Sequence, residues 1–378
     1  MQSFINKTKL MTGDRALSNL PHELRMKNVS KPMVISEKID AYKPFYKMLV
    51  KAFDNDTIKM NTIMVVEEKI ANTDVINKAI EQYWENECDS IVVVGREAVL
   101  SIAKLTKLAI EQGQKDIKNV DVVRQSRINV PLIVVPVFYG SGMEAMSYAR
   151  CYSGNVSYDY VSNALMPDIV IADNSMVMRP SKQILASSVM YALANAIIAY
   201  TDRHSNVMTR VTAMSAINII CTSINELDVR KRKAEFDGNL LTSTIIAGMA
   251  ASQLKVDDLA MMSLVVSGAI KVPYSKVYSM LFMPYYAEML DADNEYQMDV
   301  LLPIIGESRY ALTPIGKRAE EVVDNINELL TFLKSYSGFR TTLSSFGMER
   351  DMLPHIADKI AKKGIDKELV MRVLERAF

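Results

Sequence analysis

Short runs of valine and isoleucine recur along the first half of the chain, separated by longer segments with helical spacing. Nearly continuous β-branched runs are typical of strands that are buried on both faces of a sheet. The segment 73–87, by contrast, places its apolar residues three or four positions apart, as an amphipathic helix does. Strands that alternate with helices in this way predict crossover units and a parallel α/β sheet. The predicted strands lie at 31–36, 61–68, 90–96, 131–140 and 167–174.

The second half of the chain has a different pattern. After Asn174 no run of that kind recurs, and long apolar segments with helical character continue to Phe378. Pro180 can open a helix where the pattern changes. The sequence therefore predicts two domains, an α/β domain with a Rossmann-like parallel sheet at 1–178 and an all-α domain at 179–378.

The composition is that of a globular protein with sizeable cores. The chain has 378 residues, of which 49% are hydrophobic and 23% are charged. Its 44 Lys and Arg balance its 44 Asp and Glu, so the net charge favours neither nucleic acid nor an anionic membrane as a partner. The three cysteines are widely spaced, and neither a signal peptide nor an uncharged apolar run of about 20 residues is evident. We expect a cytoplasmic protein with reduced cysteines.

One helical segment carries polar groups in an apolar setting. Residues 184–200 contain no formal charge, yet Tyr191 and Asn195 lie among them one helical turn apart. Positions i and i+4 share a helix face, so the phenol and the carboxamide point into one place. This pair marks the first candidate site.

The chain contains, in this order, the segments "GDRALSNLPHEL", "SIVVVGREAVLSIAK", "YGSGMEAMSYA", "PDIVIADN", "SSVMYALANAIIAY", "LLTSTIIAGMAAS" and "VPYSKVYSMLFMPYY". In order and spacing they resemble the iron-containing alcohol dehydrogenases, which share a fold with dehydroquinate synthase. The resemblance covers most of the chain. It implies a nucleotide-binding α/β domain, a helical domain and an active site in the cleft between them. It also implies an NAD(P)-linked oxidoreductase of a small-molecule alcohol or aldehyde and, as is common in the family, a homodimer.

The family's metal ligands are all replaced in this sequence. In the family, an aspartate and a histidine lie one turn apart on the helix that matches 184–200, and two further histidines follow. Tyr191 stands at the aspartate position and Asn195 at the first histidine position, while alignment from "AGMA" puts Ala260 and Tyr274 at the other two. A neutral phenol, a carboxamide and a methyl group are not ligands for iron or zinc, so we expect neither metal.

Other potential ligands lie elsewhere. Asp257 and Asp258 precede the apolar helix that contains Ala260, and we expect them to cap that helix or to face solvent. The three histidines of the chain stand at none of the four ligand positions: His22, His204 and His355.

The first of the family's two nucleotide-binding turns is altered. In the family, glycines before a helix let the backbone approach a pyrophosphate. Here Gly95 remains, Arg96 and Glu97 replace glycines, Ala98 follows, and Ser101 replaces an aspartate. The added side chains crowd the path of the pyrophosphate, so we expect NAD or NADP to bind weakly.

The second turn is better preserved. Gly140, Ser141, Gly142 and Glu144 match it or are changed conservatively, although a strand-to-helix turn needs glycine for its own sake. Ser36 stands where the family often has an acidic residue after the second strand, and loss of that charge would tolerate the 2′-phosphate of NADP.

The sequence is consistent with two functions, one enzymatic and one without catalysis. In the first, the chain is an oxidoreductase in which Tyr274 replaces the metal as the electrophile, with Lys276 as a nearby cation that could assist proton transfer. In the second, the chain is a catalytically silent relative that keeps the fold for binding or assembly. Family descent places the oxidoreductase slightly first, and the sequence leaves both open.

Overall fold

The computed structural model of the chain describes residues 4–38, 43–53, 58–68, 70–124, 126, 128–140, 142–154, 156–177, 181–227, 234–254, 257–291, 294–338 and 340–378. It divides into two compact units. One comprises Asn6–Arg179 with Lys231–Ile245, and is called the α/β unit below. The other comprises Met1–Ile5, Pro180–Arg230 and Ile246–Phe378, and is called the helical unit.

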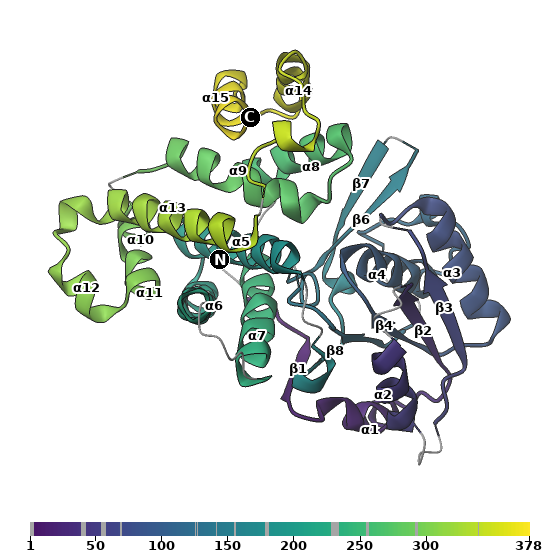
Figure 1. The fold of residues 1–378 in the computed structure, drawn as a ribbon. Helices are drawn as coiled ribbons and strands as arrows, with labels where there is room; N and C mark the ends of the chain where they lie inside the picture. The colour runs from purple at the N-terminus through teal and green to yellow at the C-terminus, as the bar shows by residue number, and fades with distance from the viewer. Residues whose placement is uncertain are drawn as a thin grey trace. The chain divides into compact units, whose positions relative to one another are not determined.

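The α/β unit is built on a six-stranded sheet in the order β1-β8-β5-β4-β2-β3, in which every neighbouring pair is parallel (Figure 1). The predicted parallel sheet is therefore confirmed. Its strands are β1 (Lys9–Gly13), β2 (Pro32–Glu37), β3 (Thr62–Val66), β4 (Ser90–Val94), β5 (Leu132–Val135) and β8 (Ile169–Asp173). The central strands are buried along their whole length, which explains their nearly continuous valine and isoleucine.

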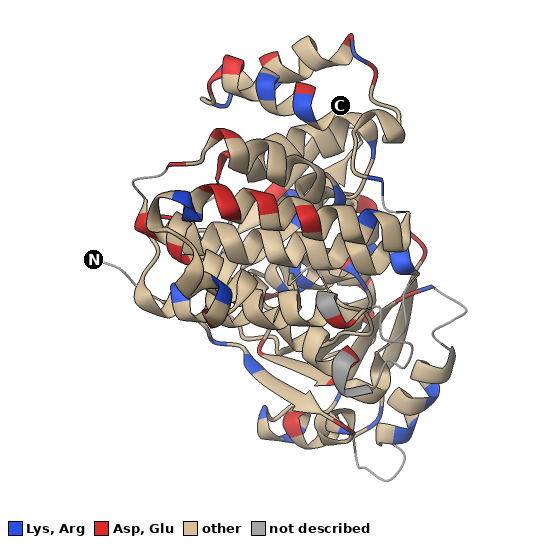
Figure 2. Ribbon diagram, turned by 60° about the vertical axis from the view of Figure 1, so that its left-hand side comes forward, with Lys and Arg blue, Asp and Glu red and all other residues tan. Residues whose placement is uncertain are grey.

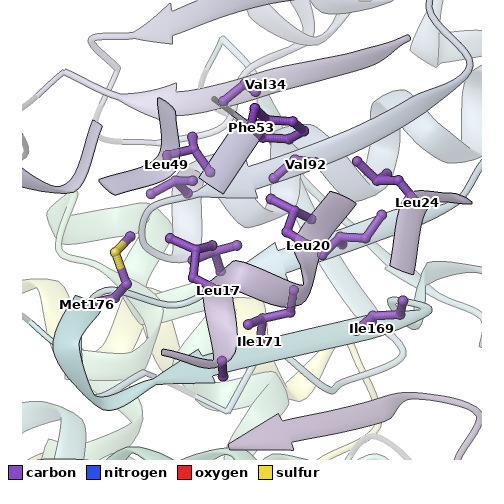
Figure 3. Packing of buried hydrophobic residues seen from close by; sticks show 14 of the residues in the cluster. Leu17, Leu20, Leu24, Val34, Leu49, Phe53, Val92, Ile169, Ile171 and Met176 are labelled. Atoms are coloured by element: carbon purple, nitrogen blue, oxygen red, sulfur yellow. The ribbon is translucent and has the colours of Figure 1, made fainter. Parts of the chain in front are cut away.

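Alternate residues of these strands face opposite sides of the sheet. Val34, Val92 and Ile171 lie on the face that packs against Leu20 of α1 (Leu20–Met26) and Phe53 of α2 (Lys43–Phe53) (Figure 3). The intervening strand residues point to the other face, and α4 (Glu97–Glu111) contacts the strands β2, β4 and β5. The sheet is thus a middle layer with helices on both sides, as a crossover topology requires.

The helices of this unit are α1 (Leu20–Met26), α2 (Lys43–Phe53), α3 (Thr73–Glu85) and α4 (Glu97–Glu111). An antiparallel hairpin of β6 (Tyr148–Ser153) and β7 (Val156–Val161) forms a separate two-stranded sheet. The sequence did not predict β1, β6 or β7. β1 is a short edge strand, and β7 is half exposed, so neither has a continuous apolar run.

The helical unit contains α5 (Lys182–Thr201), α6 (Val207–Glu226), α8 (Asp258–Ile270), α9 (Tyr274–Glu288), α10 (Glu295–Asp299), α11 (Leu301–Ile305), α12 (Glu307–Leu312), α13 (Arg318–Ser337), α14 (Met352–Ala361) and α15 (Lys367–Ala377). No strand follows β8 in the described part of the chain, as predicted. Ser181 starts α5 by accepting a hydrogen bond from the Ile184 amide.

Helix α7 (Ala234–Ala251) begins in the α/β unit and continues in the helical unit. Its first part belongs with the sheet because the Asp237 carboxylate accepts a hydrogen bond from the Tyr139 hydroxyl. Gly238 also lies so close to Asn174 that a β-carbon there would be 2.1 Å from the amide oxygen of that residue. The predicted boundary between two domains at residue 178 therefore does not describe the first part of α7, which belongs to the α/β unit.

In the described part of the chain, two helices are apolar enough to cross a membrane by length and composition alone, over Lys182–Thr201 and Val207–Ile224. Of these windows, 78% and 50% are buried inside the protein, and a core helix of a soluble protein passes the same test. Acidic and basic residues are interspersed along the ribbon (Figure 2), in line with the balanced net charge.

Candidate functional site

Tyr191 and Tyr274 lie side by side in the helical unit, although they are far apart in the sequence. Tyr191 is in the middle of α5 and Tyr274 is the first residue of α9. Their ring centroids are 6.1 Å apart, and the rings meet edge to face at 76°. Tyr278, one turn further along α9, packs against both, at 5.2 Å from Tyr191 and 5.8 Å from Tyr274. These three residues are called the tyrosine cluster below.

The cluster is almost fully buried. The exposed fractions of Tyr191, Tyr274 and Tyr278 are 2%, 7% and 3%. Burial raises the pKa of the Tyr278 phenol well above its ordinary value, and the nearby charge of Asp257 adds to the effect. Tyr278 therefore stays protonated at neutral pH and can act only as a neutral hydrogen-bonding group.

Asn195 lies one turn after Tyr191 on α5 and is also buried. Its side-chain nitrogen has no hydrogen-bond partner among the described residues. An unsatisfied buried donor costs about 1–3 kcal/mol. The donor group of Asn195 is therefore available to a molecule or ion that the structure does not contain.

Asp257 caps α8, as expected. Its carboxylate accepts a hydrogen bond of 2.6 Å from the Ala260 amide. Burial raises the pKa of Asp257 to about 6, against the opposing effect of that hydrogen bond. Ala260 is thus held in the first turn of α8 and offers only a methyl group.

Lys276 does not join the tyrosine cluster. Its ammonium group lies over the ring of Phe346, 5.0 Å from the centroid. Burial and then the charge of Arg340 lower the pKa of the Lys276 amine. Residues i and i+2 of a helix face different directions, so this geometry does not favour a role for Lys276 beside Tyr274, and that role stays a prediction.

No group of three or more His, Cys, Asp or Glu residues in the described ranges is arranged to hold a metal ion. The three histidines, His22, His204 and His355, are all exposed. The three cysteines, Cys88, Cys151 and Cys221, are buried free thiols.

The turn that the resemblance aligns with the family's first nucleotide-binding turn lies in the α/β unit, at the end of β4. Gly95 follows the strand, Arg96 is the N-cap of α4 in an extended conformation, and Glu97 and Ala98 lie in the first turn of α4. A β-carbon on Gly95 would lie 3.1 Å from the Val99 β-carbon, so this turn needs a glycine. Glu97 places a negative charge at a helix N-terminus, where it stabilises the helix.

Arg96 does not extend freely into solvent. Its Nε donates to both carboxylate oxygens of Glu37, at 3.2 and 3.0 Å, and its Nη2 makes a further short contact with the same carboxylate. The guanidinium also lies over the ring of Phe138, 5.4 Å from the centroid. The side chain expected to crowd the pyrophosphate is thus held by an ion pair at the carboxyl ends of the strands.

The assignment of Ser36 to the acidic position after the second strand is wrong. Strand β2 continues one residue further, to Glu37. Ser36 is fully buried, and its hydroxyl is 2.7 Å from the Tyr46 hydroxyl. The carboxylate at the end of the strand is that of Glu37, and its charge is retained.

The second turn encloses a buried carboxylate. A β-carbon on Gly140 would lie only 1.9 Å from Glu144 Oε1, and Gly142 has a φ of 77°. Burial raises the pKa of Glu144 to about 7, opposed by backbone hydrogen bonds and by Lys104. Glu144 Oε2 has no hydrogen-bond partner among the described residues. Ser141 lies outside the described residues.

Lys104 holds this turn together. Its ammonium group donates to the carbonyls of Met143 and Met146, each at 2.6 Å, and of Tyr148 at 3.1 Å. Burial lowers the pKa of Lys104 to about 7. Ser101, one turn earlier on α4, is buried and accepts a hydrogen bond from the Arg150 amide at 3.3 Å. Ser101 thus ties α4 to β6.

Sequence reasoning missed three of these residues. Tyr278 could have been found because it lies four residues after Tyr274, on the same face of a helix. Glu37 was missed by one residue at a strand end, where sequence patterns are least certain. Nothing in the sequence indicated that Lys104 is buried, because a lysine on an α/β crossover helix is ordinarily exposed.

Comparison with known proteins gives a family match over nearly the whole chain. A family model described as iron-containing alcohol dehydrogenase matches residues 7–174, and one described as the C-terminal part of the Fe-containing alcohol dehydrogenase family matches residues 185–370. The "Probable alcohol dehydrogenase EutG" of Salmonella typhimurium is 27% identical over 211 residues, or 54% of this chain and 52% of that protein. The matched part therefore spans about half the length of that relative.

Solved structures show the same fold over the whole chain. An alcohol dehydrogenase from Oenococcus oeni superposes with a TM-score of 0.88 at 19% identity and covers 100% of both chains. A sulfoacetaldehyde reductase from Bifidobacterium kashiwanohense in complex with NAD+ superposes with a TM-score of 0.84 at 14% identity, covering 100% of this chain and 98% of that one.

Proposed function

The chain belongs to the iron-containing alcohol dehydrogenase family, and we propose that it is an NAD(P)-linked oxidoreductase of an alcohol or aldehyde that works without the family's iron or zinc. The observation that carries the proposal is the edge-to-face contact of Tyr191 and Tyr274, with Asn195 one helical turn from Tyr191 and its buried amide nitrogen without a partner among the described residues. At the positions that the resemblance aligns with the family's ligands, these three side chains are the hydrogen-bonding groups of the proposed site.

The residues at the ligand positions do not fit a transition metal. Iron and zinc take imidazole, carboxylate or thiolate ligands. Tyr191 and Tyr274 offer phenols, Asn195 a carboxamide and Ala260 a methyl group. No step of the proposed reaction therefore passes through a metal.

In the proposed mechanism, a phenol of the cluster polarises the substrate carbonyl in place of the metal. Tyr274 donates a hydrogen bond to the oxygen on which negative charge develops, and the Asn195 amide is a second donor for the same oxygen. One donor of this kind is worth roughly 3–4 kcal/mol, while a metal acting as a Lewis acid supplies several kcal/mol. Turnover without metal is therefore expected to be slower than in metal-containing relatives.

The residues of the α/β unit fit a dinucleotide. Gly95 and Gly140 lie after the buried strands β4 and β5 and carry no side chain, and α4 presents its N-terminus after β4. A bound nicotinamide cofactor supplies or accepts the hydride. Gly95, Gly140 and Gly142 add no side chain to these turns, whereas the side chains of Arg96 and Glu97 narrow the path of the pyrophosphate, which weakens the binding of NAD or NADP relative to a turn with glycines there.

The alternative is a catalytically silent family member with a binding or structural role. Its support is the packing of the tyrosine cluster itself, in which three rings contact each other edge to face or tilted and each is more than nine-tenths buried. In this case the rings fill the position of the former metal and face no substrate.

The test separates the two functions with a matched pair of variants. Tyr274→Phe should lower kcat for NAD(P)H-linked reduction of a panel of aldehydes roughly 100- to 1,000-fold, with an unchanged melting curve. Tyr286→Phe, later on the same helix, removes a buried hydroxyl that has no partner among the described residues, and should leave kcat unchanged. Turnover that survives Tyr274→Phe would refute the role of the phenol, and absence of turnover in the wild-type protein would favour the silent alternative.

The remaining parts of the proposal concern partners and location. We expect a homodimer in the cytoplasm, a small-molecule substrate, and neither nucleic acid nor membrane as a partner. The support is the balanced charge and the family's common assembly. Light scattering in solution would show the mass of the assembly.

A further inference from the structure

The Glu37–Arg96 ion pair lies at the carboxyl ends of β2 and β4, between which the direction of the crossover connections reverses. β2 continues through α2 to β3 on one side, while β4 continues through α4 to β5 on the other. Since β2 and β4 are neighbours, the direction of the crossovers reverses between them. Ligands of open α/β sheets bind at the carboxyl ends of the strands at such a switch point. Glu37 ends β2 and Arg96 follows β4, so the pair spans this point.

The pairing changes what the Glu37 carboxylate can do. In dinucleotide-binding α/β sheets, a carboxylate beside the ribose accepts hydrogen bonds from its hydroxyls in NAD, whereas a nearby arginine accommodates the 2′-phosphate of NADP. Here both Glu37 oxygens accept hydrogen bonds from Arg96. A ribose diol must therefore compete with a guanidinium for the same oxygens, while the repulsion of a phosphate is neutralised.

The ion pair is also held in place. Arg96 stacks on Phe138, which limits the movement of the guanidinium plane. The Tyr46 hydroxyl donates to the Glu37 carbonyl at 3.0 Å and fixes the end of the strand. The Arg96 side chain is 42% exposed and the Glu37 side chain 14%, so a ligand approaching from solvent meets the cation first.

A second cation lies next to the pair. Lys38 follows Glu37 and makes an exposed ion pair of 2.6 Å with Glu67, just after β3. The carboxylates of Glu37 and Glu67 are thus each matched by a basic residue. A guanidinium presents a planar fork of N–H donors that suits a phosphate.

We propose that the Glu37–Arg96 pair makes this chain prefer the cofactor with a 2′-phosphate, NADP(H), over NAD(H), with Arg96 as the phosphate-binding residue. The inference rests on the proposed function, since it assigns the ribose end of the cofactor that the function requires. It reverses the preference that a carboxylate at the end of β2 would otherwise give.

The test is an equilibrium titration followed by the fluorescence of NADPH and of NADH. The wild-type protein should bind NADPH roughly tenfold more tightly than NADH. Arg96→Gln should weaken NADPH binding roughly 10- to 100-fold, as expected for loss of a charge-assisted hydrogen bond, and should not weaken NADH binding. Glu37→Gln should strengthen NADPH binding, because it leaves the Arg96 charge to the phosphate.

Lys31→Gln is the matched control, because it removes the same charge from an exposed ion pair with Glu87 near the start of β2. It should change neither affinity. A parallel titration by calorimetry with adenosine 2′,5′-bisphosphate and with ADP isolates the adenosine end of the cofactor, and the former should bind more tightly.

Two results would overturn the inference, and they differ from failure of the proposed function. Tighter binding of NADH than of NADPH by the wild-type protein would contradict it, as would an equal loss of both affinities in Arg96→Gln. If neither cofactor binds to protein with a cooperative melting transition, the proposed oxidoreductase function is wrong and the inference falls with it.

Discussion

Replacing Asp257 by asparagine should raise the free energy of unfolding at neutral pH and leave the free energy of unfolding unchanged in acid. Burial raises the pKa of Asp257 from its ordinary 3.8 to about 6. A shift of that size corresponds to about 3 kcal/mol of differential stability between the two protonation states. The folded protein holds the proton to a higher pH than the unfolded chain does. The contribution of Asp257 to the free energy of unfolding is therefore largest below about pH 4 and is lost as the pH rises through about 6.

Asparagine keeps the helix cap without the charge. Its side-chain oxygen can accept the hydrogen bond from the Ala260 amide, and asparagine and aspartate are equally good N-caps. We therefore expect Asp257→Asn to raise the free energy of unfolding at about pH 7–8 by up to about 3 kcal/mol, with no difference at about pH 4.

Urea unfolding of both proteins at intervals between about pH 4 and 8 measures this difference. Asp366→Asn is the control, because Asp366 caps α15 from an exposed position. Its effect should stay small across the range, since water solvates the charge. An Asp257→Asn variant that is less stable than the wild-type protein at pH 8, or a difference that is independent of pH, would refute the burial of this carboxylate beside Tyr278.

Four further predictions concern the two turns, helix α8 and the tyrosine cluster. Gly140→Ala should destabilise the protein by about 1–3 kcal/mol in urea unfolding, because its β-carbon would meet Glu144 Oε1 at 1.9 Å. Gly268→Ala, where no atom lies within 4 Å of the added carbon on α8, should instead stabilise it by about 0.5–1 kcal/mol. Arg96→Gly combined with Glu97→Gly should strengthen NADH binding in a fluorescence titration by opening the path of the pyrophosphate, and unchanged affinity in a folded variant would tell against crowding. Tyr191→Ala should cost about 3–5 kcal/mol in urea unfolding, since it empties a buried site packed against two aromatic rings, and a cost below about 1 kcal/mol would show that the cluster is not packed as described.

The sheet could be predicted from the sequence because its central strands are buried on both faces. That burial forces valine and isoleucine at consecutive positions, as in β4 and β8, and leaves a pattern that a single sequence displays. β7 has alternating exposure and polar residues, so its pairing with β6 is decided by the turn between them and by tertiary contacts.

The candidate site could be predicted only where residues share a helix. Tyr191 and Asn195 are one turn apart on α5, so their common direction follows from helix geometry. The contact of Tyr191 with Tyr274 depends on the packing of α5 against α9, which the spacing of residues along one helix does not predict. Tyr274 was identified through the family resemblance. Lys276 was suggested by its position two residues after Tyr274, whereas in the structure its ammonium group lies over the ring of Phe346.

The ion pair of Arg96 is a contact that the sequence alone does not predict. The sequence indicates that an arginine replaces a glycine in the turn after β4, which suggests steric crowding of a ligand. Its partner Glu37 comes from another strand, and only the order of the strands in the sheet brings the two together. A residue that seemed only to obstruct the site is therefore also a candidate for binding the ligand.

The metal content of the protein tests the central claim most directly. The purified protein is incubated with excess Fe(II) or Zn(II) in the absence of oxygen, desalted, and analysed by inductively coupled plasma mass spectrometry. If phenols, a carboxamide and a methyl group occupy the four ligand positions, as the resemblance implies, well below one metal ion per ten chains is expected, roughly the level of adventitious binding. One iron or zinc per chain, retained after desalting and lost in Tyr191→Phe, would contradict the account and return the chain to the metal-dependent members of its family.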